Sequence, residues 1–289
     1  MSRGKVPTPG RRVGPVRVAL LGTGRMGAAI AKRLSAAGHE LVLWNRTAER
    51  AREVGVGRVA ASVEEAVTDA EVVLSILYDA GAVLDVLGRV RPQGQLFVQM
   101  STAGPDTEEK LAEHLEASGS RLLTAPILGS VPAIEQGSAL ILVGGDSDAF
   151  ESARPVLEAF GQAEFVGTRR AAAALKLLNN AMLGAVSLAA AELLAAGERE
   201  GLDAKTLFRL LTRTVPYLQA RSRSYLDRDH TSTLFEVGAI VKDLDLALDA
   251  AHAAGAAMPV SGQARELYGL VAGEHGHDEM TAVIELFSR

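Results

Sequence analysis

A lysine and an asparagine stand in the otherwise apolar stretch between Arg169 and Glu200, and their types and spacing suit proton transfer. Lys176 and Asn180 are four residues apart, so a helix places both on one face. Burial of an ammonium group is costly and lowers its pKa, so such a group usually has a partner or a task. An ammonium near a carbonyl oxygen can protonate the alkoxide that hydride delivery creates, while Asn180 holds the lysine or that oxygen. The competing interpretation from the residues alone is a lysine that extends to solvent at a domain junction.

A glycine-rich turn provides the second set of residues with a chemical use. Gly22, Gly24 and Gly27 have GxGxxG spacing between the apolar run VRVALL and a helical stretch. In this context the first glycine permits a tight turn, the second lets the backbone approach a pyrophosphate, and the third allows close packing. The pattern predicts a dinucleotide site at a helix N-terminus. We expect it to include Gly22, Thr23, Gly24, Arg25, Met26 and Gly27.

The end of the next apolar run bears on the choice of dinucleotide. NAD-specific folds usually place an acidic residue there to bind the ribose 2′-hydroxyl. This chain instead has Asn45, Arg46 and Thr47, with no carboxylate to repel a 2′-phosphate. The Arg46 guanidinium is suited to that phosphate, so the sequence favours NADP(H) as the cofactor. The alternative is that Arg46 is only a solvated residue at the start of a helix.

These residues must be positioned by alternating strands and helices, because short apolar runs alternate with amphipathic stretches from Val16 to near Gly167. The predicted strands are VRVALLG, HELVLWN, EVVLSIL, GQLFVQM, RLLTAP, ALILVGG and AEFVG. The predicted helices are RMGAAIAKRLSAAG, TAERARE, AGAVLDVLGRV, Asp106–Ser118 and Asp148–Phe160. Such alternation predicts an α/β fold with a mostly parallel sheet.

The chain changes character after Gly167. Residues 169–200 contain no proline and are apolar on nearly all faces, which predicts one long helix joining two domains, and the rest also looks helical. We expect a disordered tail over 1–15, a Rossmann domain that binds NADP over 16–167, and an all-α domain for substrate binding and oligomerisation over 168–289.

Composition narrows the class of partner. The chain has 289 residues, 48% of them hydrophobic, and a net charge of −5 with basic residues spread along it. This predicts a small-molecule substrate, with neither nucleic acid nor a membrane as partner. Cysteine is absent, which excludes disulfides and thiolate catalysis and fits a reducing compartment. The basic N-terminus has no apolar signal core, so we expect a cytoplasmic protein.

Six stretches taken together resemble the β-hydroxyacid dehydrogenases, the family that contains 3-hydroxyisobutyrate dehydrogenase and the glyoxylate and succinic semialdehyde reductases. The stretches are LLGTGRMG, NRT, QMSTAGPDT, TAPILGSVPAIEQGSALILVGG, ALKLLNN and VKDLDLAL, in the family's order, within Val16 to Phe287. The resemblance implies a Rossmann domain followed by an all-α domain like that of 6-phosphogluconate dehydrogenase. It also implies dimers or tetramers assembled through the helical part.

The resemblance also implies roles for individual residues. Lys176 matches the catalytic lysine and Asn180 a neighbouring residue that contacts substrate. The implied substrate-binding residues are Ser101, Thr102, Ala103, Leu128, Gly129, Ser130, Asn180 and Phe235. Further residues implied at the cofactor are Leu77, Tyr78, Thr102 and Lys242, the last at the nicotinamide side.

Two positions depart from the family pattern. Leu128 replaces a serine near the substrate carboxylate, which removes a donor and adds apolar bulk. The sequence Leu128-Gly129-Ser130 looks more like the glyoxylate and semialdehyde reductase branch, which reduces with NADPH and so agrees with Arg46. Tyr78 stands where the family commonly has proline. We therefore expect NADPH-dependent reduction of a small carboxylate-bearing aldehyde or keto acid.

Other functions compete with this hypothesis. The same site can oxidise a 3-hydroxy acid such as 3-hydroxyisobutyrate, and imine reductases share the fold and cofactor but commonly carry another residue at the lysine position. A non-catalytic module that binds NADPH is disfavoured by Lys176 and Asn180. His275 and His277 are more typical of a solvated turn than of a metal site, so we expect no metal. Tyr217 and Arg221 are further candidates for setting substrate choice.

Overall fold

The computed structural model describes residues 14–288, so residues 1–13 of the predicted tail lie outside the described part of the chain. The described residues divide into two compact units. The first comprises the chain up to Ser101 together with Asp106–Ala172, and the second comprises Thr102–Pro105 and the chain from Ala173 onward. The division thus falls after Ala172, a few residues later than the predicted boundary near Gly167.

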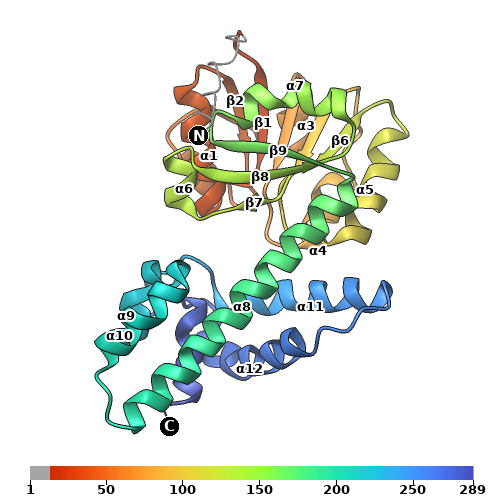
Figure 1. The fold of residues 1–289 in the computed structure, drawn as a ribbon. Coiled ribbons are helices and arrows are strands. Elements are labelled where there is room, and N and C mark those ends of the chain that lie inside the picture. The colour runs from red at the N-terminus through yellow and green to blue at the C-terminus, as the bar shows by residue number, and fades with distance from the viewer. Residues whose placement is uncertain (1–13, 289) are drawn as a thin grey trace, which may run out of the picture. The chain divides into compact units, whose positions relative to one another are not determined.

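A nine-stranded sheet is the centre of the first unit (Figure 1). The strands are β1 (Arg17–Leu21), β2 (Glu40–Trp44), β3 (Arg58–Val59), β4 (Val72–Ser75), β5 (Leu96–Gln99), β6 (Arg121–Thr124), β7 (Ile127–Leu128), β8 (Ala139–Gly144) and β9 (Gly161–Gly167). Their order is β3-β2-β1-β4-β5-β6-β8-β7, and β9 pairs with β8. Pairing is parallel except where β8 meets β6 and β7. The predicted mostly parallel Rossmann-like sheet is therefore confirmed.

Seven helices of the described residues connect these strands. They are α1 (Arg25–Ala36), α2 (Ala48–Arg52), α3 (Val63–Val67), α4 (Ala80–Leu87), α5 (Pro105–Glu116), α6 (Val131–Glu135) and α7 (Ser147–Leu157). Local chemistry fixes several starts, because Ser62, Asp79 and Asp146 accept a hydrogen bond from the backbone N–H three residues on. The central strands β4 and β5 are buried along their whole length, as expected for parallel strands covered on both faces.

The second unit is helical. Its elements are α8 (Arg169–Arg199) from Ala173 onward, α9 (Ala204–Thr214), α10 (Ser222–Leu226), α11 (Val237–Ala253), α12 (Pro259–His275) and two 3₁₀-helices, Pro216–Arg221 and Met280–Leu286. Helix α8 is the predicted long helix. Its length and composition would also suit a membrane span. Half of its most apolar segment is buried by the rest of the described chain, as in the core helix of a globular fold.

A close approach of two helices sets the geometry of the second unit. A Cβ atom added at Gly184 of α8 would lie 3.2 Å from the side chain of Ile240 in α11. The missing side chain therefore lets the two helices approach closely. The hydroxyl groups of Tyr225 and Tyr268 donate to the carbonyl oxygens of Ser187 and Gly184, at 2.8 and 3.1 Å. These bonds hold the middle of α8 in the helical core.

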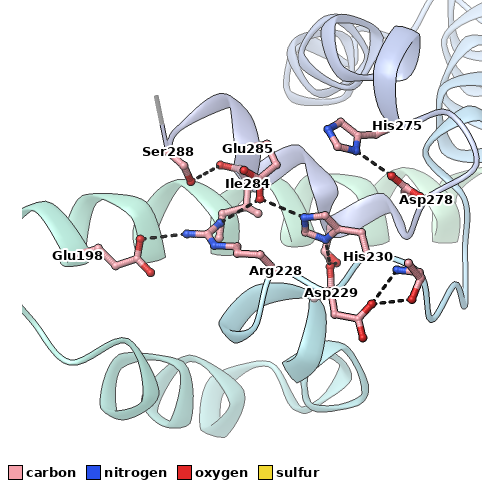
Figure 2. A network of polar contacts seen from close by, with 12 residues as sticks. Glu198, Arg228, Asp229, His230, His275, Asp278, Ile284, Glu285 and Ser288 are labelled. Carbon is pink, nitrogen blue, oxygen red and sulfur yellow. Dashed lines mark hydrogen bonds and ion pairs between the residues drawn. The ribbon is translucent and has the colours of Figure 1, made fainter.

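A polar network links the far end of α8 to the C-terminal 3₁₀-helix (Figure 2). Arg228 pairs with Glu198 at 3.0 Å and with Glu285 at 3.7 Å, and His230 bonds Glu285 at 3.0 Å. The other ring nitrogen of His230 lies 2.6 Å from the buried Ser224 hydroxyl. The network ties three separate stretches of the second unit together.

Candidate active site

The glycine turn of the first unit is a backbone structure into which side chains cannot fit. Gly22 has a φ of 102°, and a Cβ atom there would lie 2.2 Å from the carbonyl oxygen of Ile76. A Cβ atom at Gly27 would lie 2.0 Å from the carbonyl oxygen of Gly22. Both contacts are sterically forbidden, so the turn between β1 and α1 requires glycine at these two positions.

Gly24 is glycine for a different reason. It precedes α1 as the N-cap residue, its φ is −66°, and a Cβ atom there would meet no described atom within 4 Å. The fold does not require a glycine here, whereas a ligand approaching the free N–H groups at the start of α1 would. Beside it, the hydroxyl oxygen of Thr23 is buried and has no hydrogen-bond partner in the described residues. The open backbone and the orphaned hydroxyl both fit a dinucleotide pyrophosphate.

The end of β2 lies against the same turn. The backbone N–H of Thr23 donates to the side-chain oxygen of Asn45 at 3.1 Å, and the amide of Asn45 donates to the carbonyl of Thr47 at 3.0 Å. Arg46 is exposed and forms no hydrogen bond or ion pair with residues 14–288. The structure thus places Asn45 beside the glycine turn and leaves the Arg46 guanidinium at the surface. Arg25 is likewise exposed at the first position of α1, with Met26 half-buried behind it.

Ser101 lies directly after β5, where it is 5% exposed. Its hydroxyl oxygen accepts a hydrogen bond from the backbone N–H of Leu77 at 2.7 Å. The structure therefore brings two predicted site residues together, one after β4 and one after β5. The next residue, Tyr78, is 62% exposed, in contrast to the buried serine.

The departure at Leu128 occupies the end of β7. Leu128 is half-buried and is followed by Gly129 with a φ of 149°. Ser130 is the N-cap residue of α6 but makes no side-chain capping bond. The hydroxyl of Ser130 is therefore not used to cap the helix, which leaves it for another partner.

Lys176 belongs to a cluster of four charged or polar side chains in the second unit, together with Asn180, Lys242 and Asp243. The Asp243 carboxylate is 2% exposed and accepts hydrogen bonds from Asn180 at 2.6 Å and from the Lys242 ammonium at 2.5 Å. Lys242 also donates to the carbonyl oxygen of Thr102 at 3.1 Å. Asp243 thus anchors both the asparagine next to Lys176 and the second lysine.

The environment of Lys176 changes its titration. Burial lowers the pKa of Lys176 to about 8. The nearby Lys242 ammonium also lowers this pKa, whereas the Asp243 carboxylate raises it. With a pKa of about 8, roughly nine-tenths of the ammonium remains protonated at pH 7. Lys176 is then a proton donor near neutral pH and a stronger acid than an ordinary lysine, which suits general acid catalysis.

Phe235 is held by a buried acid that sequence reasoning missed. The carboxylate of Glu279, 1% exposed, accepts from the backbone N–H groups of Leu234 and Phe235 at 2.6 and 3.0 Å. Arg221 pairs with the same carboxylate at 2.8 Å and lies 4.1 Å from the centre of the Tyr217 ring. Tyr217 and Arg221 therefore belong to the structure that supports Phe235.

Other predicted residues occupy less informative positions. Thr102 is half-buried and Ala103 is buried at the start of the short Thr102–Pro105 segment. His275 bonds Asp278 at 2.8 Å, and His277 bonds Glu236 at 3.3 Å. Over residues 14–288, no group of three or more histidine or acidic side chains is arranged to hold a metal ion.

Two family models together cover almost the whole described chain. The model described as the NAD binding domain of 6-phosphogluconate dehydrogenase matches residues 17–172. The model described as the NAD-binding region of NADP-dependent 3-hydroxyisobutyrate dehydrogenase matches residues 171–287. The match changes from one model to the other at the same part of α8 where the two units divide.

Individual relatives agree with the family models. A probable 3-hydroxyisobutyrate dehydrogenase of Mycobacterium tuberculosis is 31% identical over 92% of this chain and 96% of the relative. Glyoxylate/succinic semialdehyde reductase 2 of Arabidopsis thaliana is 29% identical over 96% of this chain and 82% of the relative. These identities are too similar to separate the two branches. A solved structure of the M. tuberculosis 3-hydroxyisobutyrate dehydrogenase with L-serine has a TM-score of 0.84 and 29% identity, covering 95% of this chain and 100% of that one. The chain therefore belongs to the 3-hydroxyisobutyrate dehydrogenase family of β-hydroxyacid dehydrogenases, which are NAD(P)-dependent oxidoreductases acting on CH–OH groups.

Proposed function

We propose that this enzyme reduces the carbonyl group of a small carboxylate-bearing aldehyde or keto acid, with NADPH as cofactor. The observation that supports this proposal most is Lys176, an ammonium with a pKa of about 8 next to the Asn180–Asp243 pair. When bound, the cofactor supplies a hydride to the carbonyl carbon. Lys176 donates a proton to the carbonyl oxygen, so the ammonium becomes a neutral amine and the product is a hydroxy acid. The lysine then regains its proton from solvent.

The other residues of the proposal bind and orient. Asn180, fixed by Asp243, holds the reacting oxygen or the lysine. Ser101, Thr102, Gly129 and Ser130 hold the substrate carboxylate, and the Leu128 side chain adds apolar surface beside it. Gly24 and Thr23 hold the pyrophosphate, and Lys242 serves the nicotinamide side.

A substrate panel tests the proposal directly. Glyoxylate, succinic semialdehyde, methylmalonate semialdehyde and tartronate semialdehyde are each mixed with enzyme and NADPH, and absorbance of the cofactor is followed. We expect at least one to be reduced, and we expect 3-hydroxyisobutyrate to be oxidised more slowly with NADP⁺. A panel without any reduction contradicts the proposed substrate class, and faster oxidation contradicts the direction.

Cofactor choice depends on Arg46 in this proposal. Because hydrogen bonds to charged groups contribute about 1.5–3 kcal/mol, Arg46→Ala should raise the KM for NADPH roughly 10- to 100-fold. The KM for NADH should change less than about twofold, since NADH has no 2′-phosphate. The control is Arg50→Ala, which removes another exposed arginine from α2. Equal KM values for NADPH in wild type and Arg46→Ala would show that Arg46 is only a solvated side chain.

The pH dependence of reduction should respond to Asp243. Its carboxylate raises the pKa of Lys176, so Asp243→Asn should lower that pKa and move the alkaline decline of kcat/KM to lower pH by about one unit. The control is Asp245→Asn on the same helix, whose carboxylate pairs with Arg265 at 2.6 Å. A profile unchanged by Asp243→Asn would mean that another group controls the decline.

Assembly and location complete the proposal. We propose a homodimer or homotetramer formed through the helical unit, in the cytoplasm. Exposed apolar side chains on one stripe of α8, at Leu175, Leu178 and Met182, support an oligomer because monomers rarely leave such a stripe in water.

A further inference from the structure

Three buried polar side chains lie beneath Ser101 in the first unit, and the proposed reaction does not use them. Gln99 ends β5, Glu108 lies on α5 and Thr124 ends β6, with exposures of 0%, 1% and 1%. Buried polar groups are expensive unless they are paired, and residues that are only structural are usually apolar at such positions. This group therefore needs an explanation.

The amide of Gln99 holds the backbone of Ser101 at both polar atoms. Its oxygen accepts a hydrogen bond from the Ser101 N–H, and its nitrogen donates to the Ser101 carbonyl at 3.0 Å. Rotating the amide by half a turn would place its oxygen against the carbonyl and its NH₂ against the N–H. An acceptor would then face an acceptor and a donor would face a donor. Only the observed orientation of the amide therefore holds Ser101.

Glu108 fixes that orientation from the other side. One carboxyl oxygen accepts the second hydrogen of the Gln99 amide nitrogen, and the other accepts from the Thr124 hydroxyl at 2.6 Å. Both amide hydrogens of Gln99 are therefore used, one on Ser101 and one on Glu108. Burial raises the pKa of Glu108 to about 7, while the bonds from Thr124 and Gln99 lower it.

The result is a defined direction for the Ser101 hydroxyl. Its oxygen accepts from the Leu77 N–H, and its hydrogen has no acceptor among residues 14–288. A hydroxyl has one hydrogen to donate, so this hydrogen is available for a ligand. A carboxylate is the ligand that the proposed reaction supplies.

We infer that Glu108 is a positioning residue for substrate binding: acting through Gln99, it holds Ser101 so that the serine hydroxyl donates to the substrate carboxylate. The inference rests on the proposed function for the identity of that carboxylate. The arrangement of Glu108, Gln99 and Ser101 itself does not depend on it.

Kinetics of two variants test the inference. In Glu108→Met the second hydrogen of the Gln99 amide nitrogen has no acceptor, and we expect the substrate KM to rise about tenfold or more, as for loss of one hydrogen bond to a charged group. The KM for NADPH should change less than about twofold, a difference that general destabilisation would not produce. Glu108→Gln keeps a carbonyl oxygen for Gln99 and offers an NH₂ group to Thr124, so it should restore the substrate KM to within about threefold. Glu113→Met, at an exposed position of the same helix, is the control.

Hydrogen exchange tests the same arrangement without turnover. In the wild-type protein the amides of Leu77 and Ser101 should exchange at least about 100-fold more slowly than in an unstructured peptide. In Glu108→Met that protection should fall, while the amides of β4 and β5 keep theirs. If Glu108→Met does not fold, the wild-type measurement and Glu108→Gln still decide.

Three results would overturn the inference. They are unprotected Leu77 and Ser101 amides in the wild type, a Glu108→Met enzyme with wild-type substrate KM, and a Glu108→Gln enzyme whose substrate KM is itself raised about tenfold or more. An enzyme inactive on the whole substrate panel contradicts the proposed function instead. The hydrogen exchange of the Leu77 and Ser101 amides then tests the arrangement of Glu108, Gln99 and Ser101 independently of substrate.

Discussion

Lys176→Ala should lower kcat for carbonyl reduction by about 10³-fold, within the range found when a general acid is removed. The dissociation constant of NADPH, measured by fluorescence titration, should remain within about twofold, because the glycine turn and the end of β2 belong to the other unit. A loss of turnover with intact cofactor binding places the defect in the chemical step. The control is Lys205→Ala, which removes an exposed lysine from α9.

The pH dependence of kcat/KM in the wild-type enzyme tests whether Lys176 acts as the proton donor. Reduction needs the protonated lysine, so kcat/KM should be level below about pH 7 and fall as pH rises through the Lys176 pKa of about 8. Oxidation of the hydroxy acid needs the neutral amine and should rise over the same interval. Wild-type turnover in Lys176→Ala, or a reduction rate that increases through pH 8, would remove Lys176 as the proton donor.

Gly24→Ala should weaken NADPH binding by roughly 5- to 150-fold, the effect of about 1–3 kcal/mol of overpacking against the pyrophosphate. The fold should survive, because a Cβ atom at this position meets nothing within 4 Å and the φ of −66° suits alanine. Alanine is a poorer N-cap residue than glycine by less than about 1 kcal/mol, so Tm without cofactor should fall by only about 2–4 °C. Calorimetric titration and thermal unfolding measure the two effects.

Two other glycines provide the comparison for this prediction. Gly273→Ala also adds a methyl group in open space, in α12, and should leave NADPH binding unchanged. Gly22→Ala should prevent folding of the turn, since its Cβ atom would lie 2.2 Å from a carbonyl oxygen. If Gly24→Ala binds NADPH as tightly as the wild type, the pyrophosphate does not lie against Gly24.

Much of the fold is predictable because it depends on local patterns. The alternation of apolar runs and amphipathic stretches predicted seven strands, and a long proline-free stretch that is apolar on nearly all faces predicted the long helix. Strands β3 and β7 have two residues each and were not predicted, because so short a run has no period. The antiparallel pairing of β8 depends on long-range contacts that no local pattern encodes.

The candidate site is predictable to the extent that its residues are neighbours in sequence. Lys176 and Asn180 share a helical face, and this much follows from their spacing. The bond from Asn180 to Asp243 was not predicted, because it depends on how α11 packs on α8, 63 residues away in the sequence. Glu108 had a signal that was not used. It is spaced by three, four and seven residues from Leu111, Ala112 and Leu115, all of which are buried, so the helical period itself places the carboxyl on the buried face of α5.

The glycine turn after β1 and Arg46 after β2 differ in how far a substitution there would disturb the fold. A side chain at Gly22 or Gly27 would clash with backbone atoms, so almost any substitution at these two positions should disrupt the fold. Arg46 is exposed and has no bond to the described residues, so its exchange leaves the folded state nearly untouched. In the proposed function the preference for NADPH depends on Arg46, so this preference can be changed without disturbing the glycine turn, and a redesign for NADH should begin at that arginine.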